Sequence, residues 1–147
     1  MPDSIKKQIC AAIQTALSAL STTQDGAFKK VERRFDPLQF TDVHPTLFWR
    51  TGPEVEIGKD NQGRTYRFPL IIATHFKGVD KLEQHDDLVA AIQDVIEGNI
   101  QLGGLVNVID GGTEDPWVDD QAKDLGGSVI IYQVQYRRVR GAAHRMY

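Results

Sequence analysis

The segment that most constrains the fold runs from Arg64 to Phe76 and reads RTYRFPLIIATHF. Its large apolar side chains fall on alternate positions, which is the periodicity of a β-strand with one buried face. The predicted core face is Tyr66, Phe68, Leu70, Ile72 and Phe76, with Thr74 among them, and the other face is Arg67, Pro69, Ile71, Ala73 and His75. A long alternating strand favours an antiparallel sheet with one face covered by other elements. Pro69 cannot donate a ladder hydrogen bond, so we expect an edge strand or a bulge there.

Two amphipathic helices can supply that cover. The first begins at Asp3 or Ser4, and its apolar stripe continues to about Leu20. The second is LEQHDDLVAAIQDVIE, Leu82–Glu97, and Asp80 is placed to cap it. The stripe residues expected to face the sheet are Ile9, Ile13, Leu17, Leu88, Ile92 and Val95.

Shorter alternating runs complete the pattern. We predict further strands at Phe28–Phe35, Leu47–Thr51, Val55–Ile57, Leu105–Asp110 and Ser128–Val139, with a hairpin turn at Lys59–Gly63. The resulting order is a helix, three or four strands, a helix and two strands. This order predicts an α+β fold: a mainly antiparallel sheet with the two amphipathic helices packed on one face.

The composition indicates one domain of ordinary size. The chain has 147 residues, 41% hydrophobic content and a formal net charge of -3, so it can bury a core and has no overall basic excess for nucleic acid. We expect a single domain over residues 1–147, with a flexible C-terminal tail from about Gly141. Cys10 is the one cysteine, which excludes an intramolecular disulfide and suits a reducing compartment. We expect no signal peptide and no membrane partner, since no apolar run approaches the roughly 20 residues that a span needs.

A search for catalytic chemistry finds none of the common motifs. The sequence has no phosphate-binding glycine loop, no nucleophile elbow and no zinc-protease motif. The four histidines, His44, His75, His85 and His144, are not spaced as a ligand pair. His85 precedes two aspartates, but neighbouring helical positions point in different directions, which favours a histidine on the helix surface. Cys10 is interpreted as a small buried hydrophobe. We therefore expect no catalytic residue, no cofactor and no metal.

The stretch Gly111–Ser128, GGTEDPWVDDQAKDLGGS, is the most unusual in the chain. Glycine pairs open and close it, and five acids and a tryptophan lie between them. The acids lack the spacing of a calcium loop, and composition alone favours a plain solvated acidic loop. Long loops inside compact domains are usually functional or disordered, however, and an exposed tryptophan commonly serves an interface. We interpret the stretch as an assembly loop with the candidate interface residues Glu114, Asp115, Trp117, Asp119 and Asp120.

The last strand and the tail carry the opposite charge. Arg137, Arg138 and Arg140 follow one another closely there, and arginine forks bind phosphate or carboxylate groups. A solubilising strand end is the simpler interpretation. An acidic loop and a basic end on one chain are also complementary, which is expected of copies that assemble head to tail into a ring.

Taken together, the chain resembles the bacteriophage tail terminator, or tail completion, proteins. The resemblance begins with an N-terminal helix, a strand and the stretch HPTLFWRTGPEVEI, His44–Ile57. It continues with the helix Leu82–Glu97, the strand in LGGLVNVIDGG, an extended loop and the final strand in SVIIYQVQYRR. The match spans roughly Ser4–Arg138 and consists of order and spacing, without a catalytic signature.

The resemblance implies a structural virion protein of the tail or neck, present in the host cytoplasm during assembly, and no enzyme. Six copies would form a ring on the last tier of the tail tube and stop its polymerisation. The implied partners are further copies of the chain, the major tail tube protein and the head-tail connector or stopper protein, with phage DNA passing through the channel. Two alternatives stay open: a head-tail joining (stopper) protein, and a small ferredoxin-like cytosolic enzyme or binding module.

Overall fold

The computed structural model describes residues 4–21, 28–33, 45–77, 82–98, 106, 108–118 and 125–139. Its elements in chain order are α1 (Ile5–Ser18), β1 (Lys30–Arg33), β2 (Thr46–Thr51), β3 (Val55–Lys59), β4 (Gly63–Lys77), α2 (Leu82–Glu97), β5 (Val108–Val118) and β6 (Leu125–Val139). Ser4 caps α1, because its hydroxyl accepts the amide of Lys7 at 3.2 Å. The predicted cap at Asp80 and the predicted flexible tail from about Gly141 lie outside the described residues.

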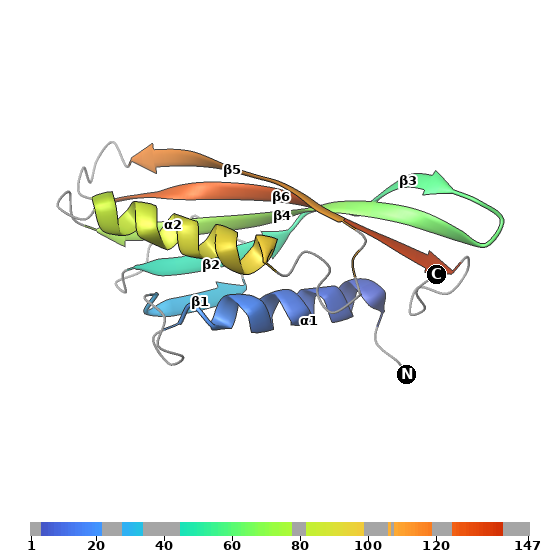
Figure 1. Cartoon of the computed structure of the whole chain (residues 1–147), viewed down its shortest axis with the longest axis horizontal. Coiled ribbons are helices and arrows are strands. Elements are labelled where there is room, and N and C mark those ends of the chain that lie inside the picture. Colours follow the sequence, from blue (N-terminus) through green and yellow to red (C-terminus); the bar gives the residue numbers. More distant parts are fainter. Residues whose placement is uncertain are drawn as a thin grey trace.

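The strands form one sheet in the order β1-β2-β4-β6-β5, and β3 pairs with β4 beyond the end of β2 (Figure 1). All the pairings between these strands are antiparallel except that of β1 with β2. The β4–β6 ladder is the longest and forms the centre of the sheet. The predicted α+β class with a mainly antiparallel sheet is therefore confirmed.

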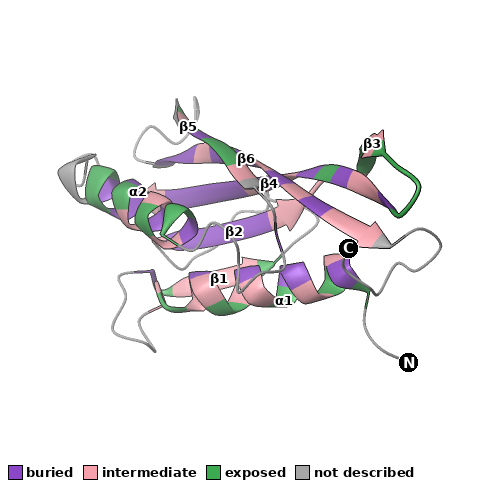
Figure 2. Ribbon diagram, turned by 45° about the vertical axis from the view of Figure 1, so that its right-hand side comes forward, coloured by how far each residue is buried: buried purple, intermediate pink, exposed green. Residues whose placement is uncertain are grey.

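Both helices lie on the same face of this sheet, as predicted (Figure 2). Their apolar stripes and the inward side chains of the central strands form one buried cluster. The predicted core residues that are buried there are Ile9, Ile13, Leu17, Phe68, Leu70, Ile72, Leu88, Ile92, Ile130, Tyr132 and Val134. Val95 is only half-buried.

The position of Pro69 corrects one prediction, because β4 is a central strand and not an edge. β2 ends opposite Leu70 and β3 begins opposite Arg67, so Pro69 faces the break between these two neighbours. The Pro69 carbonyl accepts the Gly52 amide at 2.9 Å. Because the N–H and C=O of one strand residue point to the same side, the donor that proline lacks would also face this break.

The opposite face of the sheet is partly apolar, as the alternation in β4 predicts. Phe48, Ala73 and His75 are buried on that face, and the rings of Phe48 and His75 meet edge-on at 5.1 Å. Farther along the ladder Ile71 pairs with Ile131, which is 45% exposed. This face is therefore buried around Phe48 and His75 and exposes apolar side-chain surface around Ile131.

Candidate assembly interface

The stretch predicted to be a loop is mostly strand, so that assignment is wrong. β5 continues to Val118 and β6 begins at Leu125, and only residues 119–124 between them lie outside the described part of the chain. The opening glycines form a bulge within β5, since Gly111 and Gly112 have φ angles of 99° and 94° and the register shifts there. The closing glycine pair lies within β6 and pairs with the end of β5. Both pairs therefore belong to a β-hairpin.

The acids of β5 have different surroundings. Asp115 is exposed and could contact another molecule. Glu114 is half-buried, and its carboxylate accepts the hydroxyl of Ser128 at 2.5 Å, so it is engaged within the chain. The backbone of Trp117 belongs to the β5–β6 ladder, but its side chain lies outside the described part of the structure.

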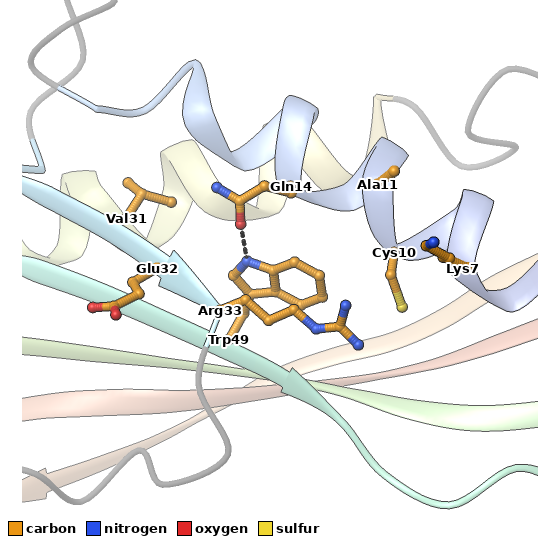
Figure 3. Close-up of a pocket in the computed structure, with 8 residues that line it drawn as sticks. All are labelled: Lys7, Cys10, Ala11, Gln14, Val31, Glu32, Arg33 and Trp49. Carbon is orange, nitrogen blue, oxygen red and sulfur yellow. Dashed lines mark hydrogen bonds between the residues drawn. The ribbon is translucent and has the colours of Figure 1, made fainter. Parts of the chain in front are cut away.

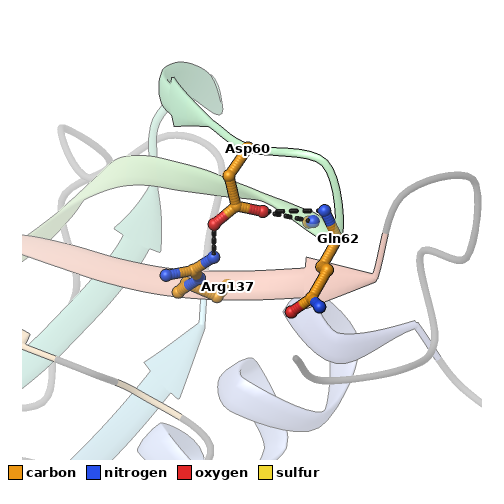
Figure 4. A network of polar contacts seen from close by, with 4 residues as sticks. Asp60, Gln62 and Arg137 are labelled. Atoms are coloured by element: carbon orange, nitrogen blue, oxygen red, sulfur yellow. Dashed lines mark hydrogen bonds and ion pairs between the residues drawn. The ribbon is translucent and has the colours of Figure 1, made fainter.

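The arginines at the end of β6 contact acids of their own chain. Arg137 forms an ion pair with Asp60 in the turn between β3 and β4 (Figure 4). Arg138 lies 4.0 Å from a Glu54 oxygen and 3.9 Å from the centre of the Tyr66 ring. Contacts to the acids of a neighbouring copy would have to compete with these contacts. The other candidate interface residues lie outside the described residues: Asp119, Asp120 and Arg140.

The turn that holds Asp60 is the predicted hairpin turn. One Asp60 oxygen accepts the amides of Gln62 and Gly63 at 2.9 Å and 2.8 Å. These two backbone donors are the largest cause that lowers the pKa of Asp60 below 3.8, and the contact with Arg137 lowers it further. Asp60 is exposed, so this pair contributes to the local geometry of the turn more than to the core.

A polar cluster that sequence reasoning missed lies between α2 and the sheet. We name it the His85 cluster, and it consists of Thr74, His85, Glu114 and Ser128 from β4, α2, β5 and β6. The His85 Nε2 atom lies 3.1 Å from the Thr74 hydroxyl and 3.3 Å from that of Ser128. The Thr74 hydroxyl also accepts the amide of Ser128 at 2.9 Å. One face of the imidazole stacks on Phe76 with a centroid separation of 4.4 Å.

The predicted surface position of His85 is therefore wrong, because only 5% of this residue is exposed. The spacing from His85 to Leu88, Val89 and Ile92 places it on the apolar stripe of α2, and that signal outweighs the adjacent aspartates. Burial is the largest cause that lowers the pKa of His85 below 6.5. The ring is accordingly neutral at pH 7 and suited to short-range hydrogen bonds with hydroxyl groups.

The His85 cluster contains a serine and a histidine, but its geometry does not suit nucleophilic catalysis. The Ser128 hydroxyl donates to Glu114, so its proton is not directed to the imidazole as in a serine nucleophile. Ser128 and Thr74 are 0% and 1% exposed, which keeps both hydroxyls from any substrate. The cluster therefore ties α2 to three strands and has a structural role.

A groove of about 420 Å³ lies between α1 and the strands β1 and β2 (Figure 3). Its floor includes Trp49, whose indole N–H donates to the Gln14 side chain at 2.6 Å, and the Arg33 guanidinium lies 5.2 Å from the indole centre. Cys10 lines the same groove but is buried, and burial raises the pKa of its thiol. A thiol with a raised pKa is a poor nucleophile, so Cys10 acts as the small buried hydrophobe that the sequence predicts.

Within the described ranges, no group of three or more histidine, cysteine, aspartate or glutamate side chains is arranged to hold a metal ion. None of the helices described is long and apolar enough to cross a membrane. The described elements run α-β-β-β-β-α-β-β, which differs from the β-α-β-β-α-β order of a ferredoxin-like scaffold.

A scan of protein-family models found no match, and a comparison with curated proteins found none. Among solved structures the chain is similar to a chain of a structure described as "Virion of native gene transfer agent (GTA) particle". The two chains share 12% identity with a TM-score of 0.41, and the alignment covers 94% of this chain and 92% of the other.

Proposed function

We propose that this protein is a structural component of a phage-like virion that closes the tail tube as a ring. The order of its elements supports the proposal: α1, a short strand, β2, the long β4, α2 and the β5–β6 hairpin follow one another as in the tail terminator proteins that the sequence resembles. This order is the observation on which the proposal rests. In this role the ring ends tube polymerisation and forms the interface to the head-tail connector.

The chemistry of the described residues is consistent with a role in assembly. The serine and histidine that meet are buried, and the thiol of Cys10 is kept protonated by burial. The apolar surface around Ile131 on the open sheet face and the acids of β5 are more readily used for contacts with proteins. Under this proposal Asp115, Trp117, Asp119 and Asp120 face a neighbouring copy, a tube subunit or the DNA channel.

The genetic test is deletion of the gene in the phage or phage-like element that encodes the chain. We expect electron micrographs to show heads and tails that do not join, with tails of irregular and often excessive length. Normal tails joined to heads would remove the proposal. Tails of normal length that fail to join heads would instead indicate the stopper function.

A biochemical test separates assembly from catalysis. Purified protein added to tail tubes should bind at one end and prevent addition of further tube subunits, which negative-stain microscopy and turbidity can follow. A protein that does not bind tube ends and stays monomeric at every concentration would contradict the proposal. Ring particles that do not bind tubes would support self-assembly but would not identify the tube as the partner.

A further inference from the structure

The charges of the molecule are divided between two sets of elements. α2 contains five carboxylates and β5 contains three, and neither element contains a lysine or an arginine. We call the exposed members of this set the acidic flank: Asp86, Asp87, Asp94, Glu97, Asp110 and Asp115.

The other set is basic. α1 contains two lysines and no acid, and the segment 29–33 that includes β1 contains three basic residues and one glutamate. We call these residues the basic flank: Lys6, Lys7, Lys29, Lys30 and Arg33. Of these, Lys7, Lys29 and Arg33 are exposed.

The fold places the strands of the two flanks at opposite edges of the sheet. β1 and β5 are the first and last strands of the sheet order, with α1 packed near β1 and α2 near β5 (Figure 1). The strands of the two flanks are thus separated by the width of the sheet, whereas the helices α1 and α2 contact each other. The β3–β4 hairpin differs, because its acids meet arginines of the same chain, as in the pairs Glu56–Arg64 and Asp60–Arg137.

Both flanks are poorly suited to adding a further strand. β5 carries the bulge at Gly111 and has Pro116 near its end, and β1 has only 4 residues, most of them charged. Such features prevent strand pairing at sheet edges. A contact at these flanks would therefore be made by charged side chains.

We propose that the acidic flank of one copy docks on the basic flank of a second copy of this chain. The contact joins two different surfaces, so repetition of it produces a ring if the rotation closes and a filament if it does not. This inference rests on the proposed ring function and identifies the surfaces by which the ring would close. It replaces the pairing of the β5–β6 region with Arg137 and Arg138, which already contact acids of their own chain.

Zero-length carbodiimide cross-linking tests the contact directly, because it joins lysine amines to carboxylates that touch. An equal mixture of ¹⁴N- and ¹⁵N-labelled wild-type protein should give mixed-isotope peptides that join Lys7, Lys29 or Lys30 to acids of α2 or β5. The Lys30–Glu32 pair, 3.2 Å apart within one chain, serves as an internal control. The mixed-isotope links should disappear at about 1 M salt, where the screening length falls to about 3 Å.

Charge-exchange variants sharpen the test. The acidic-flank variant is Asp94→Lys with Glu97→Lys, and the basic-flank variant is Lys7→Glu with Lys29→Glu. Asp94 and Glu97 lie in the last turn of α2 and Lys7 lies in the first turn of α1, so the new charges there favour each helix and should not unfold it.

In sedimentation experiments each variant alone should self-associate at least about tenfold more weakly than the wild type, because like charges then face each other. An equal mixture of the two variants should regain association, since each keeps one native flank and the two exchanged flanks are complementary. Lys59→Glu with Arg67→Glu changes exposed charges outside both flanks and should behave as the wild type does.

Several results would overturn the inference. Wild-type protein that stays monomeric and gives no mixed-isotope links would overturn it. Variants that associate as strongly as the wild type would also overturn it. A third contrary result is a basic-flank variant that associates normally and loses only the binding of labelled DNA. If rings still form and cap tubes in both variants, the flank assignment fails while the proposed function stands. If the wild-type protein neither associates nor binds tube ends, the proposed function fails as well.

Discussion

The two ends of the β4–β6 ladder use polar groups in opposite ways. At the end covered by α2, the polar side chains of Thr74, His85 and Ser128 are buried and bond to one another. At the other end Asp60 and Arg137 form an ion pair at the surface. Buried polar groups are expensive when a partner is lost, whereas exposed ion pairs contribute little to stability. One ladder thus combines an end whose buried polar groups matter for stability with an end whose exposed ion pair contributes little to it.

The two ends should differ most in the free energy of unfolding that is lost when an apolar side chain is truncated. Ile92 of α2 is 0% exposed, so Ile92→Ala should reduce the free energy of unfolding by about 2–5 kcal/mol. Val55 of β3 is 52% exposed, and Val55→Ala should cost less than about 0.5 kcal/mol. Urea denaturation measures both values. A loss below about 0.5 kcal/mol for Ile92→Ala would show that the core lies elsewhere.

Two glycines provide a second contrast. Gly112 in the β5 bulge has a φ of 94°, and a Cβ there would lie 2.6 Å from the Tyr132 ring, so Gly112→Ala should destabilise by about 1–3 kcal/mol. A Cβ added at Gly58 in β3 would meet its nearest neighbour, the Thr65 side chain, at 3.9 Å. Gly58→Ala should therefore be neutral or stabilise by up to about 1 kcal/mol. Thermal denaturation of the two variants decides this, and equal losses would contradict it.

The same positions show how far the sequence could predict the structure. Periodicity identified both helices, the long strand and the shared core, because apolar spacing is a local property of the chain. It could not place Pro69, since the tolerance of a central strand for proline depends on a break between β2 and β3 on the neighbouring side. The sequence predicts the start of a loop at Gly111 and Gly112, because a bulge and a loop both require glycine at positive φ.

The candidate site was less predictable than the fold. The His85 cluster joins two pairs of neighbouring elements, β4 with α2 and β5 with β6, that are far apart in sequence. Only the strand register brings Thr74 opposite Ser128. The charge division between the flanks could have been counted along the sequence, but its meaning depends on the sheet order, which places β1 and β5 at opposite edges. The acidic and basic residues can therefore be identified from the sequence, but their placement at opposite sheet edges follows only from the strand order.

The covered end should also give the protein a specific acid sensitivity. Burial lowers the pKa of His85 below 6.5, although Glu114 and Asp86 act in the opposite direction. The unfolded chain then takes up a proton more readily than the folded chain, so this contribution to stability is complete above about pH 6.5 and is lost as the pH falls from there toward the folded pKa. The slope from one proton is at most about 1.4 kcal/mol per pH unit.

The matched variant for this prediction is His85→Gln, which keeps a hydrogen-bonding group but cannot titrate. Its free energy of unfolding, measured by urea denaturation between about pH 7.5 and 5, should fall less steeply than that of the wild type. An unchanged slope would show that other groups cause the acid sensitivity and that the imidazole takes up its proton equally in the folded and unfolded chains.

The smallest effect is expected at the exposed end, where Arg137→Gln removes the ion pair with Asp60. Backbone amides of Gln62 and Gly63 are the largest cause of the lowered Asp60 pKa, so the variant should keep most of that lowering. Carboxyl ¹³C NMR titration follows the Asp60 pKa directly, and a return to 3.8 would make the arginine the main cause. If the lowering persists, the two backbone amides hold the Asp60 carboxylate in the turn, and the hairpin keeps its geometry without the Arg137 ion pair.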